Sequence, residues 1–311
     1  MKARSSLRNW TEYVAFRAIQ MLVAAFPIRW VGGALHGILR FIFRVWWPLR
    51  DETTARVREV FGADTPVERV RVIARTSVWN MVMNFVELFH ARRMNLDYLR
   101  AHLEGTDAAK EKLQGIIDRY GGAVIALPHM GNWDLAGVAC ARFGFSLMAV
   151  GRPQNNPLFE RWYRGARLNF QTVDRKHPSS FVRVAHHLKD GGLFAILPDV
   201  RHNKPAVPVT VFGKPDVQLG KGVSKFARMA NVPVVPFMME RLNADHHRLH
   251  LGDPILPDLD ADADADAVRI TQRVWDLFEA RIREQPEQWF WFNRRWILTP
   301  LYTQTRHKHG S

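Results

Sequence analysis

Five short apolar runs, separated by amphipathic stretches, constrain the fold of this chain more than any other feature of its sequence. The runs occupy residues 123–127, 146–150, 193–197, 207–212 and 232–237. Apolar runs of this length are typical of strands that are buried on both faces of a sheet. The helix-like stretches between them occupy residues 134–142, 158–170, 180–190 and 222–230. This alternation predicts an α/β fold with a central, mostly parallel sheet flanked by helices.

Three further helices and a linker are predicted outside this region. The series Thr65-Pro66-Val67-Glu68 is typical of a helix start, because it combines a capping box with proline at the first helical position. We expect helices at residues 66–90, 107–119 and 268–284, and a solvated linker in the Asp-Ala repeat at residues 260–267. The predicted organisation is N-terminal helices at residues 1–60, a sheet-containing domain at 61–300 and a flexible tail at 301–311.

Basic and aromatic residues are concentrated at the N-terminus. The chain carries a net charge of +14, and its first fifty residues hold eight basic side chains but a single acidic one, Glu12. The longest uncharged stretch there, residues 18–28, is eleven residues long, whereas a spanning helix needs about twenty. The pattern favours one or two helices lying in the interface of an anionic bilayer, and the alternative is an ordinary helical pair packed on the core. The residues expected at the membrane surface are Arg17, Arg29, Trp30, Arg40, Arg44, Trp46 and Trp47.

Several classes of site and partner are not expected. The single cysteine, Cys140, excludes an internal disulfide framework and a cysteine zinc site. The sequence shows no cluster of ligands with metal spacing, so we expect no metal. It also has no zinc-finger, ribonucleoprotein or helix-turn-helix signature, so the positive charge favours an anionic membrane over nucleic acid. We expect a monomer.

The residues most suggestive of chemistry follow the first predicted strand, in the series Leu127-Pro128-His129-Met130-Gly131-Asn132-Trp133-Asp134. In open α/β sheets, ligands bind beyond the carboxyl end of a strand, where this series lies. Asp134 is expected to hydrogen-bond one imidazole nitrogen of His129 and leave the other free to take a proton. Because no protein nucleophile accompanies the pair, the arrangement suits direct transfer to a substrate hydroxyl. The alternative is a structural histidine beside an aspartate that caps its helix.

These residues resemble a known family. The segment from His129 to Asp134 is similar to the H-x4-D/E motif of bacterial glycerolipid-type acyltransferases. It is most similar to the branch of lipid A late (lauroyl and myristoyl) acyltransferases, which also contains phosphatidylinositol mannoside acyltransferases. Other segments resemble that branch in the same order along the chain, at residues 151–158, 191–199, 209–213, 232–236 and 286–295. The basic run that follows Asp199, residues 200–205, departs from the branch.

The resemblance implies an O-acyltransferase that moves a fatty acyl chain from acyl carrier protein or acyl-CoA to a hydroxyl of a lipid A precursor or a related glycolipid. His129 would be the general base, and Asp134 would stabilise its imidazolium. No cofactor beyond the thioester co-substrate is implied, and the enzyme would act at the cytoplasmic face of the bacterial inner membrane. Candidate oxyanion and substrate-binding residues are Arg152, Gly131, Asn132, Asp199, Arg201 and Lys204, with Arg294 and Arg295 as candidate headgroup contacts.

Two alternatives to this function stay open from the sequence. The acceptor could be a phosphatidylinositol mannoside, a lysophospholipid or an amino-acid lipid instead of a lipid A precursor. The second alternative is a basic membrane-binding protein without catalysis, and the intact pair of His129 and Asp134 argues against it.

Overall fold

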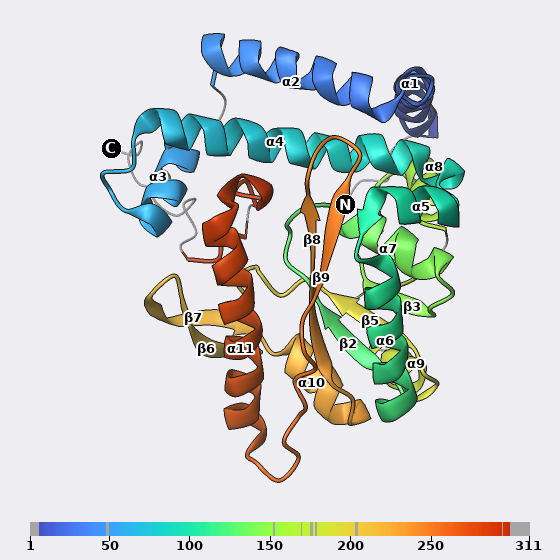
Figure 1. Ribbon diagram of the computed structural model, residues 1–311, viewed down its shortest axis with the longest axis vertical. Coiled ribbons are helices and arrows are strands. Elements are labelled where there is room, and N and C mark those ends of the chain that lie inside the picture. Colours follow the sequence, from blue (N-terminus) through green and yellow to red (C-terminus); the bar gives the residue numbers. More distant parts are fainter. Residues whose placement is uncertain are drawn as a thin grey trace.

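The computed structural model describes residues 6–47, 50–151, 153–168, 170–174, 177, 179–202, 205–293 and 295–298. Two N-terminal helices, α1 (Ser6–Ala24) and α2 (Ile28–Val45), lie as a layer above the long helix α4 (Val67–His90) in Figure 1, and the sheet lies below α4. The predicted helix at residues 66–90 is therefore confirmed as α4. The predicted tail at 301–311 falls outside the described residues.

The central sheet has seven strands in the order β1-β9-β8-β2-β5-β3-β4. All neighbouring strands run parallel except β8 and β9, which are antiparallel. The predicted α/β fold with a mostly parallel sheet is thus confirmed. The strand bounds, in sheet order, are β1 (Leu103–Glu104), β9 (His247–Leu251), β8 (Val234–Arg241), β2 (Ala123–Ala126), β5 (Leu193–Ile196), β3 (Leu147–Val150) and β4 (Gln171–Val173).

Helices cover both faces of the sheet because its strands are apolar on both sides. Along β2, Ile125 packs with α6 (Thr106–Tyr120) on one face, whereas Val124 and Ala126 lie in a second cluster on the other. This second cluster includes side chains of α9, α10 and α11. The remaining elements are α3 (Arg50–Phe61), α5 (Leu96–His102), α7 (Trp133–Arg142), α8 (Pro157–Ala166), α9 (Ser180–Lys189), α10 (Gly222–Ala230), α11 (Ala263–Glu284) and the 3₁₀ turns η1 (Ala91–Arg93) and η2 (Pro286–Gln288).

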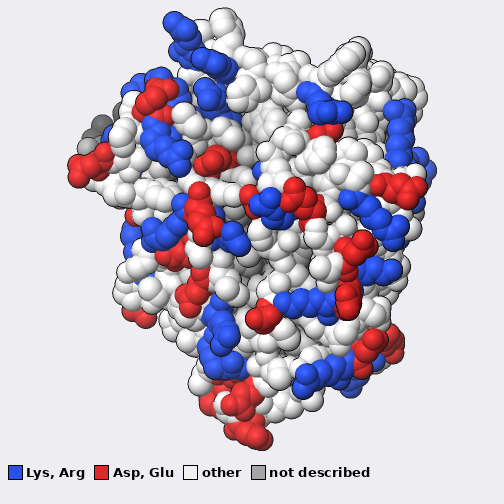
Figure 2. All heavy atoms as spheres, viewed as in Figure 1, with Lys and Arg blue, Asp and Glu red and all other residues white. Residues whose placement is uncertain are grey.

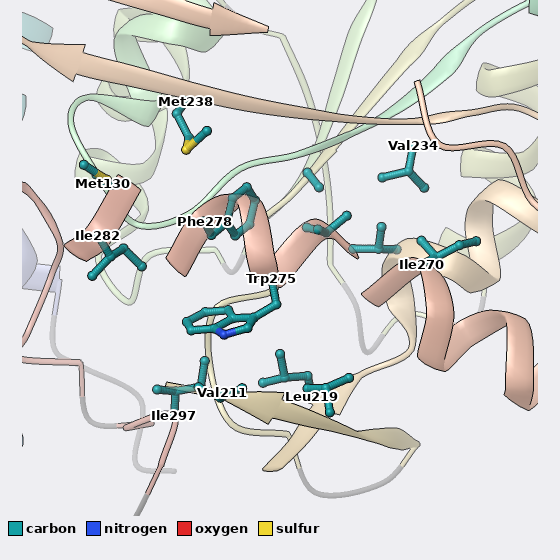
Figure 3. Close-up of a cluster of buried hydrophobic side chains, with 14 of the residues drawn as sticks. Met130, Val211, Leu219, Val234, Met238, Ile270, Trp275, Phe278, Ile282 and Ile297 are labelled. Atoms are coloured by element: carbon teal, nitrogen blue, oxygen red, sulfur yellow. The ribbon is translucent and has the colours of Figure 1, made fainter. Parts of the chain in front are cut away.

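One predicted strand does not join the central sheet. Residues 207–212 correspond to β6 (Ala206–Val211), which pairs with β7 (Lys214–Gly220) in a separate antiparallel hairpin. Valines at 207, 209 and 211 are buried and the residues between them are exposed, a period of two that suits a hairpin with one solvated face. Figure 3 shows Val211 and Leu219 of this hairpin beside Trp275 of α11, in one core cluster.

The expectation of a solvated linker at residues 260–267 is wrong. Helix α11 begins at Ala263, and the side chain of Asp262 caps it by accepting hydrogen bonds from the backbone of Asp264 and Ala265. Asp266 is buried and forms ion pairs with Arg228 at 2.8 Å and Arg269 at 2.6 Å. Alternating Asp and Ala supports the helix here, because acidic side chains favour a helix N-terminus.

The N-terminal helices expose many apolar side chains. Leu7, Trp10, Trp30, Phe41 and Trp46 are each between 61% and 74% exposed. Among the described helices, none is by itself long and apolar enough to cross a bilayer. Helices α1 and α2 together have the length and the apolar composition of a spanning segment, but the pair is bent by 113°. Helix α3 differs from them, since its Val57 and Val60 lie in the same core cluster as the sheet.

Candidate active site

Two neighbouring strands deliver the central side chains of the site. His129 follows β2, and Asp199 follows β5, which lies parallel to β2 in the sheet. Because parallel strands end at the same edge, the residues that follow them meet there. The expected position of His129 beyond the carboxyl end of a strand is thus what the structure shows.

Asp199 binds His129 through both of its carboxylate oxygens. Nδ1 of His129 lies 2.7 Å from Oδ1 of Asp199, and the backbone N–H of His129 donates to Oδ2 at 2.7 Å. The indole Nε1 of Trp289 also donates to Oδ2, at 2.8 Å. The aspartate thus fixes both the backbone and the ring of His129.

The carboxylate of Asp199 is held in its charged form. Burial would raise the pKa of Asp199, whose side chain is 1% exposed, but His129 and the hydrogen bonds from His129 and Trp289 bring that pKa below its ordinary value. A charged acceptor on Nδ1 keeps the proton of a neutral imidazole on that nitrogen. Nε2 of His129 makes no hydrogen bond to the described residues, and the side chain is 25% exposed, so this nitrogen is available to a substrate.

The expected hydrogen bond between His129 and Asp134 is not present. Asp134 instead accepts a hydrogen bond from Tyr163 at 3.0 Å and pairs with Arg167 at 3.0 Å. The end of β5 places Asp199 directly beside His129. Asp134 lies instead in the first turn of α7, where Tyr163 of α8 and Arg167 bind it. Burial raises the pKa of Asp134, against the opposite effect of Arg167, Tyr163 and His129.

An apolar chamber opens beside the histidine. Trp133, whose ring lies edge-on to His129 with centroids 5.2 Å apart, contributes to its wall. The chamber encloses about 120 Å³ between one face of the sheet and helices α6 and α7. Arg167, the partner of Asp134, lies in the wall, as does Cys140, and burial raises the pKa of the Cys140 thiol to about 12. The apolar wall suits part of an apolar chain, and the raised pKa of the buried thiol makes it unreactive.

Comparison with known proteins identifies the family. Residues 1–297 match the model of the bacterial lipid A biosynthesis acyltransferases. The chain belongs to this family. It is similar to the phosphatidylinositol mannoside acyltransferase of Mycolicibacterium smegmatis, with 27% identity over 96% of this chain and 95% of the relative. Two phosphatidylinositol mannoside acyltransferases of Mycobacterium tuberculosis are 25% and 24% identical, each over 94% of this chain and 91% of its own length. The chain is therefore an O-acyltransferase, as the resemblance implied.

The turn after His129 in this acyltransferase gives two predicted oxyanion residues other roles. The N–H of Gly131 donates to the carbonyl of Gln288 at 3.2 Å. The side chain of Asn132 caps α7 by accepting from the N–H of Leu135 at 2.9 Å, and its Nδ2 donates to Glu87 at 2.6 Å. The N–H of Gly131 and the side chain of Asn132 thus stabilise the turn.

A buried ionic network that the sequence did not reveal supports the same turn. Glu87 of α4 accepts hydrogen bonds from Arg241 at 2.6 Å and lies 2.5 Å from Nε2 of His247. Arg241 also donates to Asn84 at 2.8 Å, and Asn84 donates to the carbonyl of Gly131 at 2.8 Å. Burial would raise the pKa of Glu87, but Arg241 and His247 lower it to about 2. In this acyltransferase, Glu87 and Asn84 of α4, paired with Arg241 of β8, thus hold the turn that follows His129.

The closing aromatic motif of the sequence is explained by this site. Gln288 accepts from the N–H of Arg241 at 2.7 Å, Trp289 binds Asp199, and the N–H of Phe290 donates to the carbonyl of His129 at 2.9 Å. Ser77 of α4 donates to the carbonyl of Trp289 at 2.6 Å. Residues 160 positions from the histidine in sequence therefore hold it in place, which a local motif could not reveal.

The remaining predicted site residues make other contacts, are exposed, or fall outside the described residues. Arg152, Lys204 and Arg294 are among the residues that the structure does not describe. Arg201 donates to the carbonyl of Leu298 at 3.4 Å, and Arg295 is exposed.

The N-terminal residues that were expected at the membrane surface differ in their exposure and contacts. Trp30 and Trp46 are 70% exposed, as expected of membrane residues, and Arg40 and Arg44 are also exposed. Trp47 is instead partly buried against the core, with the guanidinium groups of Arg50 and Arg71 over its ring. Arg17 donates to the hydroxyl of Tyr13 at 3.2 Å. Arg29 pairs with Asp245 at 3.2 Å.

One group within the described residues has the composition of a metal site, although the sequence suggested none. His102, Asp245 and His246 offer ligand atoms that lie within 4.8 Å of one another. Arg29 already pairs with Asp245, and the group contains neither His129 nor Asp199.

Proposed function

We propose that this acyltransferase moves a fatty acyl chain from a thioester to a sugar hydroxyl of a membrane glycolipid, with His129 as general base and Asp199 as its orienting partner. The observation that carries this proposal is the imidazole, which a buried carboxylate fixes and which contacts Trp133 in the wall of an apolar chamber.

The proposed reaction needs no protein nucleophile. Nε2 of His129 takes the proton of the acceptor hydroxyl as the oxygen attacks the thioester carbonyl, and Asp199 stabilises the imidazolium. The tetrahedral intermediate then collapses, the carbon–sulfur bond breaks, and the imidazolium returns its proton to the leaving thiolate. A positioned base of this kind contributes about 10²–10⁴-fold to the rate. Arg152 remains our proposed donor to the oxyanion.

Two acceptors of the same class are supported by different comparisons. The family model favours a lipid A precursor, whereas the similar mycobacterial proteins are named for phosphatidylinositol mannoside. We propose the class that they share, a glycolipid with a free sugar hydroxyl, and we propose acyl carrier protein or coenzyme A as the carrier of the acyl chain. The chamber would take the acyl chain, since its wall is almost entirely apolar.

We also propose attachment to the cytoplasmic face of the inner membrane through α1 and α2. Their exposed tryptophans and arginines match the composition of interfacial helices. The acceptor would then reach the enzyme from the bilayer instead of from solution.

The test is an assay of the purified full chain in detergent with two donors, palmitoyl–acyl carrier protein and palmitoyl-CoA. The acceptors are a lipid A precursor, a phosphatidylinositol mannoside and a lysophospholipid, and products are read by mass spectrometry. We expect a mass increase of one acyl chain on a glycolipid, absent with His129→Ala. Acylation of the lysophospholipid alone would contradict the proposed acceptor class, and no transfer to any acceptor would contradict the reaction.

A further inference from the structure

We propose that a groove between α2 and α4, lined by four arginines, is a phosphate-binding site that holds the phosphate group of a membrane lipid. The groove is separate from the apolar chamber and shares no lining residue with it. The site would add a lipid-recognition function to the enzyme beyond the acyl transfer proposed above.

The groove has matched basic walls. Arg40 and Arg44 come from α2, and Arg71 and Arg75 come from α4. In each helix the two arginines are four residues apart, so they lie on one face. The groove has a volume of about 430 Å³, large enough for a phosphate group, and Phe43 and Val72 supply its apolar surface.

The charges in the groove are not balanced by the protein. Its lining includes one acidic residue, Glu68, which accepts from Arg71 at 2.6 Å. Within the described residues, Arg40, Arg44 and Arg75 have no acidic partner. The Nε atoms of Arg71 and Arg75 are buried and have no hydrogen-bond acceptor among the residues that the structure describes. Facing positive charges repel one another, so the groove favours an anion whose several acceptor oxygens the guanidinium groups can share.

Phosphate meets these requirements best. A phosphate monoester carries up to two negative charges and accepts several hydrogen bonds, and guanidinium groups match its geometry by donating in parallel pairs. A carboxylate has fewer oxygens and a single charge. The excess of three positive charges in the groove therefore favours phosphate.

The position of the groove points to a lipid as the source. Figure 2 shows lysine and arginine side chains gathered at the upper left, over the end of α2 and the start of α4. Phe41 and Val45 of α2, and Trp46 directly after it, are 68–70% exposed and lie close to Arg40 and Arg44 in sequence. If these apolar side chains enter the bilayer, the groove lies at the level of the phosphates. The choice of a lipid thus rests on the proposed membrane attachment, whereas phosphate binding itself does not.

The groove does not belong to the catalytic site. Ser77 follows Arg75 by two residues, which places it about 200° around the helix, and it is buried against Trp289. The inner face of α4 therefore supports His129, and its outer face lines the groove.

The first arm of the test uses free phosphate. Thermal unfolding of the full chain is measured in phosphate and in chloride at equal ionic strength and pH. At ten times the dissociation constant, we expect phosphate to raise the midpoint of the wild type by about 2 °C. The variant Arg40→Gln/Arg75→Gln should lose this rise, and Arg183→Gln/Arg273→Gln, which removes the same charge at two exposed positions outside the groove, should keep it. If the double variant does not fold, Arg75→Gln alone is measured.

The second arm uses vesicles of phosphatidylcholine that contain phosphatidic acid or oleic acid at matched surface charge. General electrostatic attraction is equal for the two, so the ratio of their dissociation constants reports phosphate recognition. We expect the wild type and the control variant to prefer phosphatidic acid about tenfold, and the groove variant to show a ratio near one.

The two arms separate the sources of phosphate. An arginine-dependent preference for phosphatidic acid supports a lipid phosphate, with or without a response to free phosphate. A response to free phosphate alone supports the site but overturns the lipid as its occupant. No arginine-dependent response in either arm overturns the proposal. Neither arm measures acyl transfer, so failure here is distinct from failure of the proposed reaction.

Discussion

The residues around His129 either orient its imidazole or shape the turn that follows it. Asp199 orients the imidazole, and Gly131 and Asn132 shape the turn. Gly131 has a φ of +61°, a conformation that side chains with a Cβ rarely adopt. A Cβ at this position would lie 1.6 Å from the carbonyl oxygen of Met239 in β8. Glycine is therefore required both for the turn and for its close approach to the neighbouring strand.

We predict that Gly131→Ala lowers the free energy of unfolding by about 3 kcal/mol or more, because backbone must move to admit the methyl group. Urea unfolding measures this value. Gly115→Ala on the exposed face of α6 is the matched control, since a Cβ there has nothing within 4 Å, and it should be neutral or stabilising by about 1 kcal/mol. Equal stability of the two variants would contradict the role given to Gly131.

At the scale of elements, α4 links the N-terminal layer to the catalytic edge of the sheet. Its inner face contributes Ser77, which contacts Trp289, and Glu87, which binds Asn132 and Arg241. Burial of an ionic group costs free energy unless it is paired and hydrogen-bonded, and Glu87 meets both conditions. The turn that carries His129 should therefore lose stability whenever Glu87 loses its charge.

The charge of Glu87 makes the stability of the protein depend on pH. The pKa of Glu87 is about 2 in the folded state against an ordinary value of 4.5, so its contribution is fully present above pH 4.5 and is lost as the pH falls toward 2. That contribution is roughly 3 kcal/mol at neutral pH. We expect Glu87→Gln to have a much lower free energy of unfolding than the wild type at pH 6. The difference between the two free energies should be about 1 kcal/mol smaller at pH 3.5, because the wild type loses part of the contribution of Glu87 there. A difference that stays constant over this range, in urea unfolding at each pH, would contradict the prediction.

The sequence was sufficient for most elements and for the position of the histidine. Unbroken apolar runs marked β2, β3, β5 and β8, because these strands are buried by helices on both faces. It was insufficient where long-range pairing decides the outcome. The partner of His129 depends on which strand lies beside β2, and spacing along the chain favoured Asp134 although the parallel neighbour β5 supplies Asp199. The short strands β1 and β4 have two and three residues, too few for a periodic signal.

At the scale of the whole molecule, most of the large apolar side chains that are exposed among the described residues lie at one end, between Leu7 and Trp46. Figure 1 places α1 and α2 at the top, and the segment between β9 and α11 at the opposite end. Interfacial helices combine apolar contact with electrostatic attraction, and only the latter is screened by salt. The proposed attachment should therefore have a component that survives high salt.

We predict that Trp30→Ala/Phe41→Ala/Trp46→Ala weakens binding to anionic vesicles at least tenfold at high salt, because each aromatic side chain contributes on the order of 1 kcal/mol or more at the interface. Sedimentation with vesicles at low and high salt measures the effect. The control, Leu256→Ala/Leu259→Ala, removes side chains that are 48% and 50% exposed near the opposite end, and it should bind like the wild type. If both variants bind equally, α1 and α2 are not the attachment surface.

The most direct test of the account is the acyl-transfer rate of Asp199→Asn. An asparagine at 199 keeps the size of the side chain but cannot stabilise a positive imidazole, and its amide can favour the wrong tautomer of His129. We predict that kcat falls by about 10²–10⁴-fold with KM for the acceptor little changed, and that Asp134→Asn, whose carboxylate does not bind His129, lowers kcat less. A near-normal kcat for Asp199→Asn, or a greater loss with Asp134→Asn, would contradict the assignment of Asp199 as the partner of the catalytic base.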